Sequence, residues 1–281
     1  MTKLDARFHA YRPDLADLKL SGQVEASTFV AGVPAQICLP LATLHRMPAT
    51  DSMQITQALM GETCVAFECK NGWAWVQLDN DGYVGYVLEQ ELSRALVEIT
   101  HRVCVPSTYF YQKPNIKTQP AISFPMNAAL GVKGFDGDFA EIASSGFIFA
   151  AHIVAANARE HDFVAVAEKY LNVPYLWGGK SSHGIDCSGL VQLALEACGT
   201  RSPRDSDMQE EQLGTRLMVN DLDGLKRGDL VFWDGHVGIM RDSENLLHAN
   251  GHHMSTVIEP LKSAAARISS KGFPITSIKR L

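Results

Sequence analysis

The stretch GIDCSGLV, residues 184–191, decides how the C-terminal part of this chain is interpreted. Cys187 lies between Asp186 and Ser188, after a glycine-rich segment and before an apolar run. Asp186 suits the N-cap of a helix that continues to Gly199. A cysteine in the first helical turn meets unpaired N–H groups and the positive end of the helix dipole, which favour the reactive thiolate. Cys187 is therefore a candidate nucleophile, with a packed core thiol as the alternative.

Three strand-like runs further along, DLVFW, HVGIM and LLHAN, supply a candidate base. Asp234 and Gly235 join the first two runs, and Asp-Gly between apolar runs is a strong hairpin signal. If the next turn is centred on Asp242, His236 and His248 lie directly opposite each other, with Cβ atoms ~5 Å apart. One imidazole would then accept the thiol proton while the other orients it.

The residue pattern changes near residue 157, from short β-like runs to helical periodicity. HDFVAVAEKYLNVP predicts a helix that begins after Asp162 and includes Tyr170 on its apolar face. The helix after Asp186 follows, and then the three strand-like runs. The C-terminal part is therefore expected to be an α+β unit, with helices first and an antiparallel sheet after them.

Ahead of this unit, the first 155 residues contain short β-like runs separated by turn signals. A shift of 66 residues aligns ICLP (37–40) with VCVP (103–106) and WAWV (73–76) with FAEI (139–142). A constant offset predicts two similar small β-barrels in tandem, with Trp73 and Trp75 as core residues. The expected organisation is an N-terminal extension (1–25), two barrels (26–94 and 95–155) and the α+β domain (156–281).

The composition of the chain argues against some classes of function and location. The 281 residues are 46% hydrophobic and 20% charged, with a net charge of −6, which argues against a nucleic-acid partner. No apolar run is long enough to span a bilayer, and the first 20 residues lack the apolar core of a secretory signal. We therefore expect a cytoplasmic protein with no membrane partner and with its six cysteines mostly free thiols.

No metal or organic cofactor is expected. His248, His252 and His253 could be interpreted as a metal cluster, but no cysteine or carboxylate lies at a typical zinc spacing around them. The sequence leaves the oligomeric state open.

The segments YLNVPYLWGGKSSHGIDCSGLVQLAL, GDLVFWDGHVGIM and LLHANG together resemble the NlpC/P60 family of cysteine peptidases. The two β units resemble the bacterial SH3 domains that precede this domain in γ-D-glutamyl-diamino acid endopeptidases. The resemblance implies a circularly permuted papain-like fold. It also implies that Cys187 is the nucleophile, His236 the base, His248 the residue that orients it, and Tyr175 a further catalytic residue near the thiol.

The resemblance further implies hydrolysis of the γ-D-glutamyl–diamino acid bond in murein tri- or tetrapeptides that carry a free N-terminal L-alanine. The buried ammonium of such a substrate needs a carboxylate and polar acceptors. By family position, these substrate-binding residues would be Asp186, Ser188, Ser206, Glu62 and Tyr83.

Each assignment has a purely structural alternative. Asp186 and Ser206 could serve as helix caps, Glu62 as a turn residue and Tyr83 as a packed barrel residue, while Trp177 is expected in the core or a cleft wall. Two rival functions also stay open. One is an amidase or acyltransferase of different specificity, and the other is an SH3-type module that binds cell-wall or protein ligands and carries an inert thiol.

Overall fold

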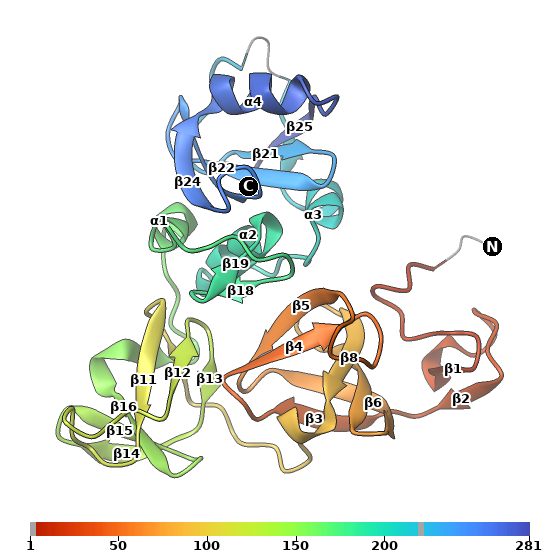
Figure 1. The fold of residues 1–281 in the computed structure, drawn as a ribbon, viewed down its shortest axis with the longest axis vertical. Coiled ribbons are helices and arrows are strands. Elements are labelled where there is room, and N and C mark those ends of the chain that lie inside the picture. Colours follow the sequence, from red (N-terminus) through yellow and green to blue (C-terminus); the bar gives the residue numbers. More distant parts are fainter. Residues whose placement is uncertain (1–3, 219–221) are drawn as a thin grey trace. The chain divides into compact units, whose positions relative to one another are not determined.

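The structure is a computed structural model that describes residues 4–218 and 222–281. The chain forms two compact units, Met1–Ala158 and Arg159–Leu281. In Figure 1 the first unit runs from red to light green, and the second runs from green to blue. Residues 1–3 of the predicted N-terminal extension lie outside the described residues.

The first repeat of unit 1 is one antiparallel sheet with the strand order β5-β4-β8-β7-β6-β3-β9. Its strands are β3 (Val33–Ile37), β4 (Leu41–His45), β5 (Gln54–Leu59), β6 (Thr63–Lys70), β7 (Trp73–Leu78), β8 (Val84–Leu88) and β9 (Leu92–Ser93). A short 3-10 helix, η2 (Glu89–Glu91), leads from β8 into β9.

The second repeat has the same strand succession divided between two sheets, β12-β11-β16-β15-β14 and β13-β10-β17. Its elements are β10 (His101–Val103), β11 (Ser107–Tyr111), β12 (Ile122–Pro125), β13 (Ala129–Leu130), β14 (Val132–Asp136), β15 (Phe139–Ile142), β16 (Gly146–Phe149), η3 (Ala150–His152) and β17 (Ile153–Ala155). The division falls at Gly131, where a Cβ atom would lie 2.8 Å from the carbonyl oxygen of Glu98. Close backbone approach therefore interrupts the strand that is continuous in the first repeat.

Equivalent backbone hydrogen bonds confirm the internal repeat. Gly61 N–H donates to Ile37 O at 3.0 Å, and Asn127 N–H donates to Val103 O at 2.9 Å. Gly61 and Asn127, which lie 66 positions apart, both have positive φ, at 82° and 67°. Glycine and asparagine tolerate this left-handed conformation best. The same turn is therefore built twice with two different residues.

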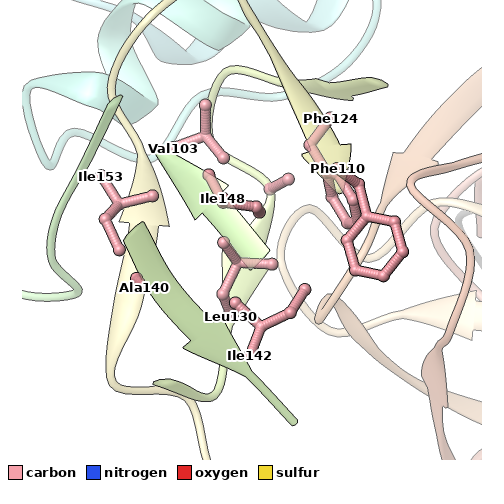
Figure 2. Packing of buried hydrophobic residues seen from close by; sticks show 9 residues of the cluster. Val103, Phe110, Phe124, Leu130, Ala140, Ile142, Ile148 and Ile153 are labelled. Atoms are coloured by element: carbon pink, nitrogen blue, oxygen red, sulfur yellow. The ribbon is translucent and has the colours of Figure 1, made fainter. Parts of the chain in front are cut away.

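The core of the second repeat is the hydrophobic cluster shown in Figure 2. It brings together apolar side chains from most of the strands of that repeat: Val103, Phe110, Phe124, Ala128, Leu130, Ala140, Ile142, Ile148 and Ile153. The rings of Phe110 and Phe124 pack with their centroids 5.9 Å apart. A closed set of inward-facing side chains is what gives a barrel this small its stability.

The N-terminal segment packs against the first repeat. It contains a parallel pair, β1 (Leu15–Asp17) with β2 (Thr28–Val30), and the short 3-10 helix η1 (Leu18–Leu20). The guanidinium of Arg12 lies over the ring of Trp75, 4.6 Å from its centroid. Trp75 is 4% exposed and is a core residue as predicted, whereas Trp73 is only partly buried.

Unit 2 has a six-stranded antiparallel sheet with the order β20-β25-β21-β22-β23-β24. Its strands are β20 (Thr215–Arg216), β21 (Leu230–Trp233), β22 (His236–Met240), β23 (Asn245–Asn250), β24 (Ser255–Pro260) and β25 (Ile275–Arg280), beside a small hairpin of β18 (Lys180–Ser181) and β19 (Gly184–Ile185). The predicted order, helices before an antiparallel sheet, is confirmed. A final helix, α4 (Leu261–Ser269), packs on β23 and β24.

The helices of unit 2 are α1 (Phe163–Glu168), α2 (Cys187–Ala197), α3 (Ser206–Gln212) and α4 (Leu261–Ser269). Asp162 caps α1 by accepting the N–H groups of Val164 and Ala165, as predicted. The helix ends before Tyr170, which is nevertheless fully buried. Within residues 4–218 and 222–281, no helix is long and apolar enough to cross a membrane.

Candidate active site

Cys187 is the first residue of α2, as the sequence predicted. The Asp186 carboxylate accepts the N–H of Gly189 at 2.7 Å and so caps the helix. After the last turn, Gly199 adopts a φ of 81° and ends the helix. Since α2 packs against β22 and β23, these caps hold the cysteine at the end of a buried helix that lies on the sheet.

The Cys187 thiol is less acidic than its helix position led us to expect. Burial and, to a smaller extent, the charge of Asp186 raise its pKa to about 12, against the opposing effects of the backbone N–H of Val237 and the charge of Arg204. The residue is 7% exposed, and the cost of desolvating a thiolate exceeds what one helix terminus provides. The expectation of an ionised resting thiol is therefore wrong, and the proton must leave during the reaction.

The rings of His236 and His248 meet on one face of the sheet. Their Nε2 and Nδ1 atoms are 2.8 Å apart. The predicted hairpin turn is present, with Trp233 paired to His236. The thiol of Cys187 lies against the N–H of Val237, which is the residue next to His236. The cysteine-bearing helix end and the histidine-bearing strand are thus in contact.

The predicted register of β22 and β23 is wrong by two residues. Met240 pairs with Leu246, and extending this register places His248 opposite Gly238 rather than opposite His236. Asp242 does not centre the turn, because its carboxylate accepts the N–H groups of Glu244 and Asn245 and shifts the loop. A slip of two residues keeps the same face, since side chains alternate with a period of two. The two histidines therefore meet diagonally. Gly238, which lies opposite His248, has no side chain that could separate the two rings.

Both imidazoles are neutral at neutral pH. Burial, together with the charges of His248 and Arg267 and against the opposing effect of Glu259, lowers the pKa of His236 to about 3. Burial also lowers the pKa of His248, which Glu259 partly offsets. A neutral imidazole retains the lone pair that a general base needs. The site thus combines a neutral thiol at the start of α2 with a neutral imidazole on β22, the strand that α2 contacts.

Asp186 and Ser188, the predicted ammonium ligands, both contact Arg204. Its Nη2 and Nη1 atoms donate to Asp186 at 2.7 and 3.0 Å, and Nη1 donates to the Ser188 hydroxyl at 2.9 Å. Arg204 is 1% exposed. The carboxylate is therefore both a helix cap and one half of a buried ion pair, so the structural alternative for Asp186 is present whatever it binds.

Ser206 is the first residue of α3 and is buried, and Asp205 precedes it at the N-cap position. The side chain of Gln209, one turn further along, donates to the carbonyl oxygens of Ser188 and Pro203, both at 2.9 Å. Through Gln209, which the sequence did not predict, the structure brings Ser206 close to the start of α2.

Tyr175 is half-buried on the segment that approaches Cys187. It forms an isolated bridge with Ile185, two residues before the cysteine. Burial raises the pKa of its hydroxyl, and Cys187 and Asp186 add to the rise. Trp177 is 60% exposed, so its expected place in the core is wrong, and the wall interpretation stays a prediction.

Glu62 and Tyr83 belong to unit 1. The Glu62 carboxylate accepts the N–H of Leu59 at 3.0 Å and closes the turn before β6. Tyr83 is 5% exposed, and its ring packs edge-on against Phe8 with centroids 6.4 Å apart. Both residues therefore have the structural roles named as alternatives, and their binding of substrate stays a prediction.

The sequence did not predict three charged residues of the site, Arg204, Glu259 and Arg267. Glu259 accepts from His248 at 2.8 Å. Arg204 lies in the polar loop before Ser206. The need of a buried Asp186 for a counter-charge was the signal that could have pointed to Arg204. Across the described residues, no cluster of three or more His, Cys, Asp or Glu side chains is arranged to hold a metal ion.

Comparison with known protein families agrees with this geometry. Residues 172–269 match the NlpC/P60 family, and residues 44–92 match the bacterial dipeptidyl-peptidase SH3 domain. A crystal structure of an NlpC/P60 family protein from Bacillus cereus superposes with a TM-score of 0.72, at 20% identity, over 88% of this chain and 99% of that one. This likeness shows that the fold is shared.

Two curated relatives match different shares of the chain. A γ-D-glutamyl-L-lysine dipeptidyl-peptidase of Bacillus subtilis is 27% identical over 71% of this chain and 73% of its own length. Dipeptidyl-peptidase 6 of Lysinibacillus sphaericus is 36% identical, but over only 36% of either chain. The chain is thus a hydrolase that carries an NlpC/P60 cysteine-peptidase domain and an SH3 domain of the bacterial dipeptidyl-peptidase type.

Proposed function

We propose that this protein hydrolyses the γ-D-glutamyl–diamino acid bond of murein peptides that have a free N-terminal L-alanine. The observation that carries the proposal is the contact between the start of α2 and β22, which sets Cys187 beside the strand of a hydrogen-bonded histidine pair. The names of the dipeptidyl-peptidase relatives support the choice of bond.

The reaction follows from a neutral thiol beside a neutral base. As Sγ of Cys187 attacks the γ-carbonyl carbon of D-glutamate, its proton moves to His236, which His248 orients. His236 then protonates the amine of the diamino acid as the C–N bond breaks, leaving a thioester. Water attacks the thioester and gives its proton to His236, which releases L-Ala-γ-D-Glu and restores the thiol.

Two further groups have roles in this proposal. The backbone N–H of Cys187, at the positive end of α2, stabilises the oxyanion, and the Tyr175 hydroxyl assists it. Asp186, Ser188 and Ser206 receive the substrate ammonium. Since Asp186 is already neutralised by Arg204, we expect the ammonium to bind through shared polar contacts rather than an isolated carboxylate. A role in recycling cytoplasmic wall fragments is part of the same proposal.

The test is turnover of L-Ala-γ-D-Glu-diaminopimelate and its L-lysine counterpart, followed by mass spectrometry. The wild type should release L-Ala-γ-D-Glu, and Cys187→Ala should release none. Cys198→Ala, at the other end of the same helix, is the matched control and should retain activity. Undiminished hydrolysis by Cys187→Ala would refute the proposed nucleophile.

A substrate whose N-terminal amine is acetylated tests the ammonium site. Its kcat/KM should fall by about two orders of magnitude, because the acetylated nitrogen loses the charge and the hydrogen bonds that the ammonium donates to these polar side chains. Equal turnover of both substrates would show that the ammonium assignment is wrong.

The rival binding function has one observation in its favour. The first repeat has a shallow groove of about 520 Å³ lined by Asn71, Gly72, Trp73, Leu88, Glu89 and Gln90. If the protein turned over no murein peptide but bound wall fragments tightly, and Trp73→Ala removed that binding, the module function would replace the proposed one.

A further inference from the structure

The histidine pair continues into two charged residues on the next elements. His248 and Glu259 lie diagonally across the β23–β24 pair, in which His248 pairs with Val257. Nε2 of His248 is 2.8 Å from Oε1 of Glu259, and the carboxylate side chain is 13% exposed. A diagonal neighbour on the same face is within reach of a long side chain.

Arg267 of α4 holds this carboxylate with two parallel bonds. Nη1 donates to Oε2 at 2.7 Å and Nη2 donates to Oε1 at 2.6 Å. Burial alone would raise the pKa of Glu259, but the hydrogen bonds from His248 and Arg267 hold it well below its usual range. An ionised carboxylate can only accept hydrogen bonds. The proton of a neutral His248 is therefore on Nε2.

This proton position determines the next one. A neutral imidazole has one donor and one acceptor nitrogen, so Nδ1 of His248 must accept. The group 2.8 Å away is Nε2 of His236, which must then donate. Nδ1 of His236 is left with the lone pair, and it is this atom that can accept a proton.

Asn250 favours the opposite arrangement. Its Nδ2 atom is 3.1 Å from Nε2 of His248, and its Oδ1 atom accepts the N–H of His253 at 2.9 Å, which sets the orientation of the amide. Donation from Asn250 would require a lone pair on that Nε2 and would reverse both tautomers. The bond to the carboxylate is shorter and charge-assisted, and such bonds are about twice as strong as neutral ones. The ring of His253, with Nδ1 at 4.0 Å from Glu259, is more distant.

We infer that Glu259, held by Arg267, is a positioning residue that sets the tautomers of both histidines and makes Nδ1 of His236 the basic atom. The inference rests on the proposed function for its catalytic consequence, but the tautomers themselves can be observed without substrate. Without the carboxylate, the amide of Asn250 donates to Nε2 of His248 and reverses both tautomers. The basic atom of His236 is then Nε2, which faces His248 instead of the reacting thiol.

The direct test is ¹⁵N NMR of the full chain with labelled histidine, at pH 7. In the wild type, both His236 and His248 should show the Nε2–H form. In Glu259→Gln, Arg267 retains the side-chain oxygen and the amide nitrogen faces His248, so both rings should switch to Nδ1–H. If the wild type already has Nδ1–H rings, the inference is overturned, whether or not the variant folds.

Kinetics give the second readout. Glu259→Gln should lower kcat on the order of 10²-fold or more while KM changes little, as expected when a base is held in the wrong tautomer. Glu244→Gln, an exposed glutamate in the turn before β23, is the matched control and should behave as wild type. The double variant Glu259→Ala/Asn250→Ala removes both competing groups and should be faster than Glu259→Ala.

The outcomes separate the two proposals. Wild-type turnover together with an unchanged kcat in Glu259→Gln would overturn the positioning role and leave the proposed function standing. Absent turnover of every murein peptide, together with the expected tautomers and their reversal in Glu259→Gln, would overturn the proposed function and leave the tautomer assignment standing.

Discussion

Replacing Arg204 with methionine should destabilise unit 2 strongly. The substitution keeps most of the apolar stem but removes the guanidinium that bonds both oxygens of Asp186 at 2.7 and 3.0 Å. The side chains of Arg204 and Asp186 are 1% and 9% exposed, so water cannot replace the lost partner. Breaking a buried pair on one side costs about 3–5 kcal/mol. Because Gly178 and Gly189 still donate to the carboxylate, we expect about 3 kcal/mol.

The assay is differential scanning calorimetry of the full chain, with hydrogen exchange used to assign the transition that contains α2. A loss of about 3 kcal/mol in a unit of this size lowers Tm by roughly 10 °C. Arg227→Met is the matched control, because Arg227 pairs with the carboxylates of Asp162 and Glu168 but is 38% exposed. Its cost should stay below about 1 kcal/mol.

A double variant separates an unpaired charge from a packing defect. Asp186→Leu/Arg204→Met removes both charges, so it should be more stable than Arg204→Met alone, even though the helix cap is lost at about 1 kcal/mol. The reasoning is refuted if Arg204→Met costs no more than Arg227→Met, or if the double variant loses the sum of its two single costs.

Three other predictions test separate parts of the chain. Because burial lowers the pKa of His236 to about 3, the unfolded state binds the proton more readily than the folded state does, and stability should fall as pH drops from about 6.5 towards 3. Thermal melts of the wild type and of His236→Phe across this pH range check this. An equal dependence of Tm on pH in both proteins would contradict it. Ile148→Val in the fully buried core of the second repeat should cost about 1 kcal/mol in urea unfolding, whereas Ile116→Val, at a side chain 71% exposed, should cost almost nothing. Arg12→Ala removes the stacking on Trp75 and should speed limited trypsin cleavage of the N-terminal segment several-fold, and an unchanged digestion rate would show that this contact does not hold the segment.

Several features were predictable because they depend on residues that are close in the chain. The Asp186 cap needs only the N–H of Gly189 three positions on, and the hairpin at Asp234 needs only its two turn residues. The repeat was detectable because equivalent strands kept similar residues at one constant offset, ICLP with VCVP and WAWV with FAEI. Local geometry of this kind follows directly from the residue types.

The errors have two sources, the packing around a residue and side-chain bonds within a turn. The acidity of Cys187 was misjudged because its burial, which raises the thiol pKa to about 12, depends on how the rest of unit 2 packs around the start of α2. The histidine register was displaced because the side chain of Asp242 bonds into its own turn and moves the loop. Because side chains alternate with a period of two, the prediction placed both histidines on the correct face of the sheet but gave His248 the wrong residue opposite it.

The sequence by itself determined the candidate nucleophile, the order of helices and strands, the duplicated barrel and the face shared by His236 and His248. Only the tertiary structure decided that Asp186 is paired with Arg204, and that His248 bonds to Glu259. The physical reason is range: caps, turns and alternation arise between neighbours in the chain, whereas desolvation and buried ion pairs depend on segments that meet only once the sheet and its helices have packed.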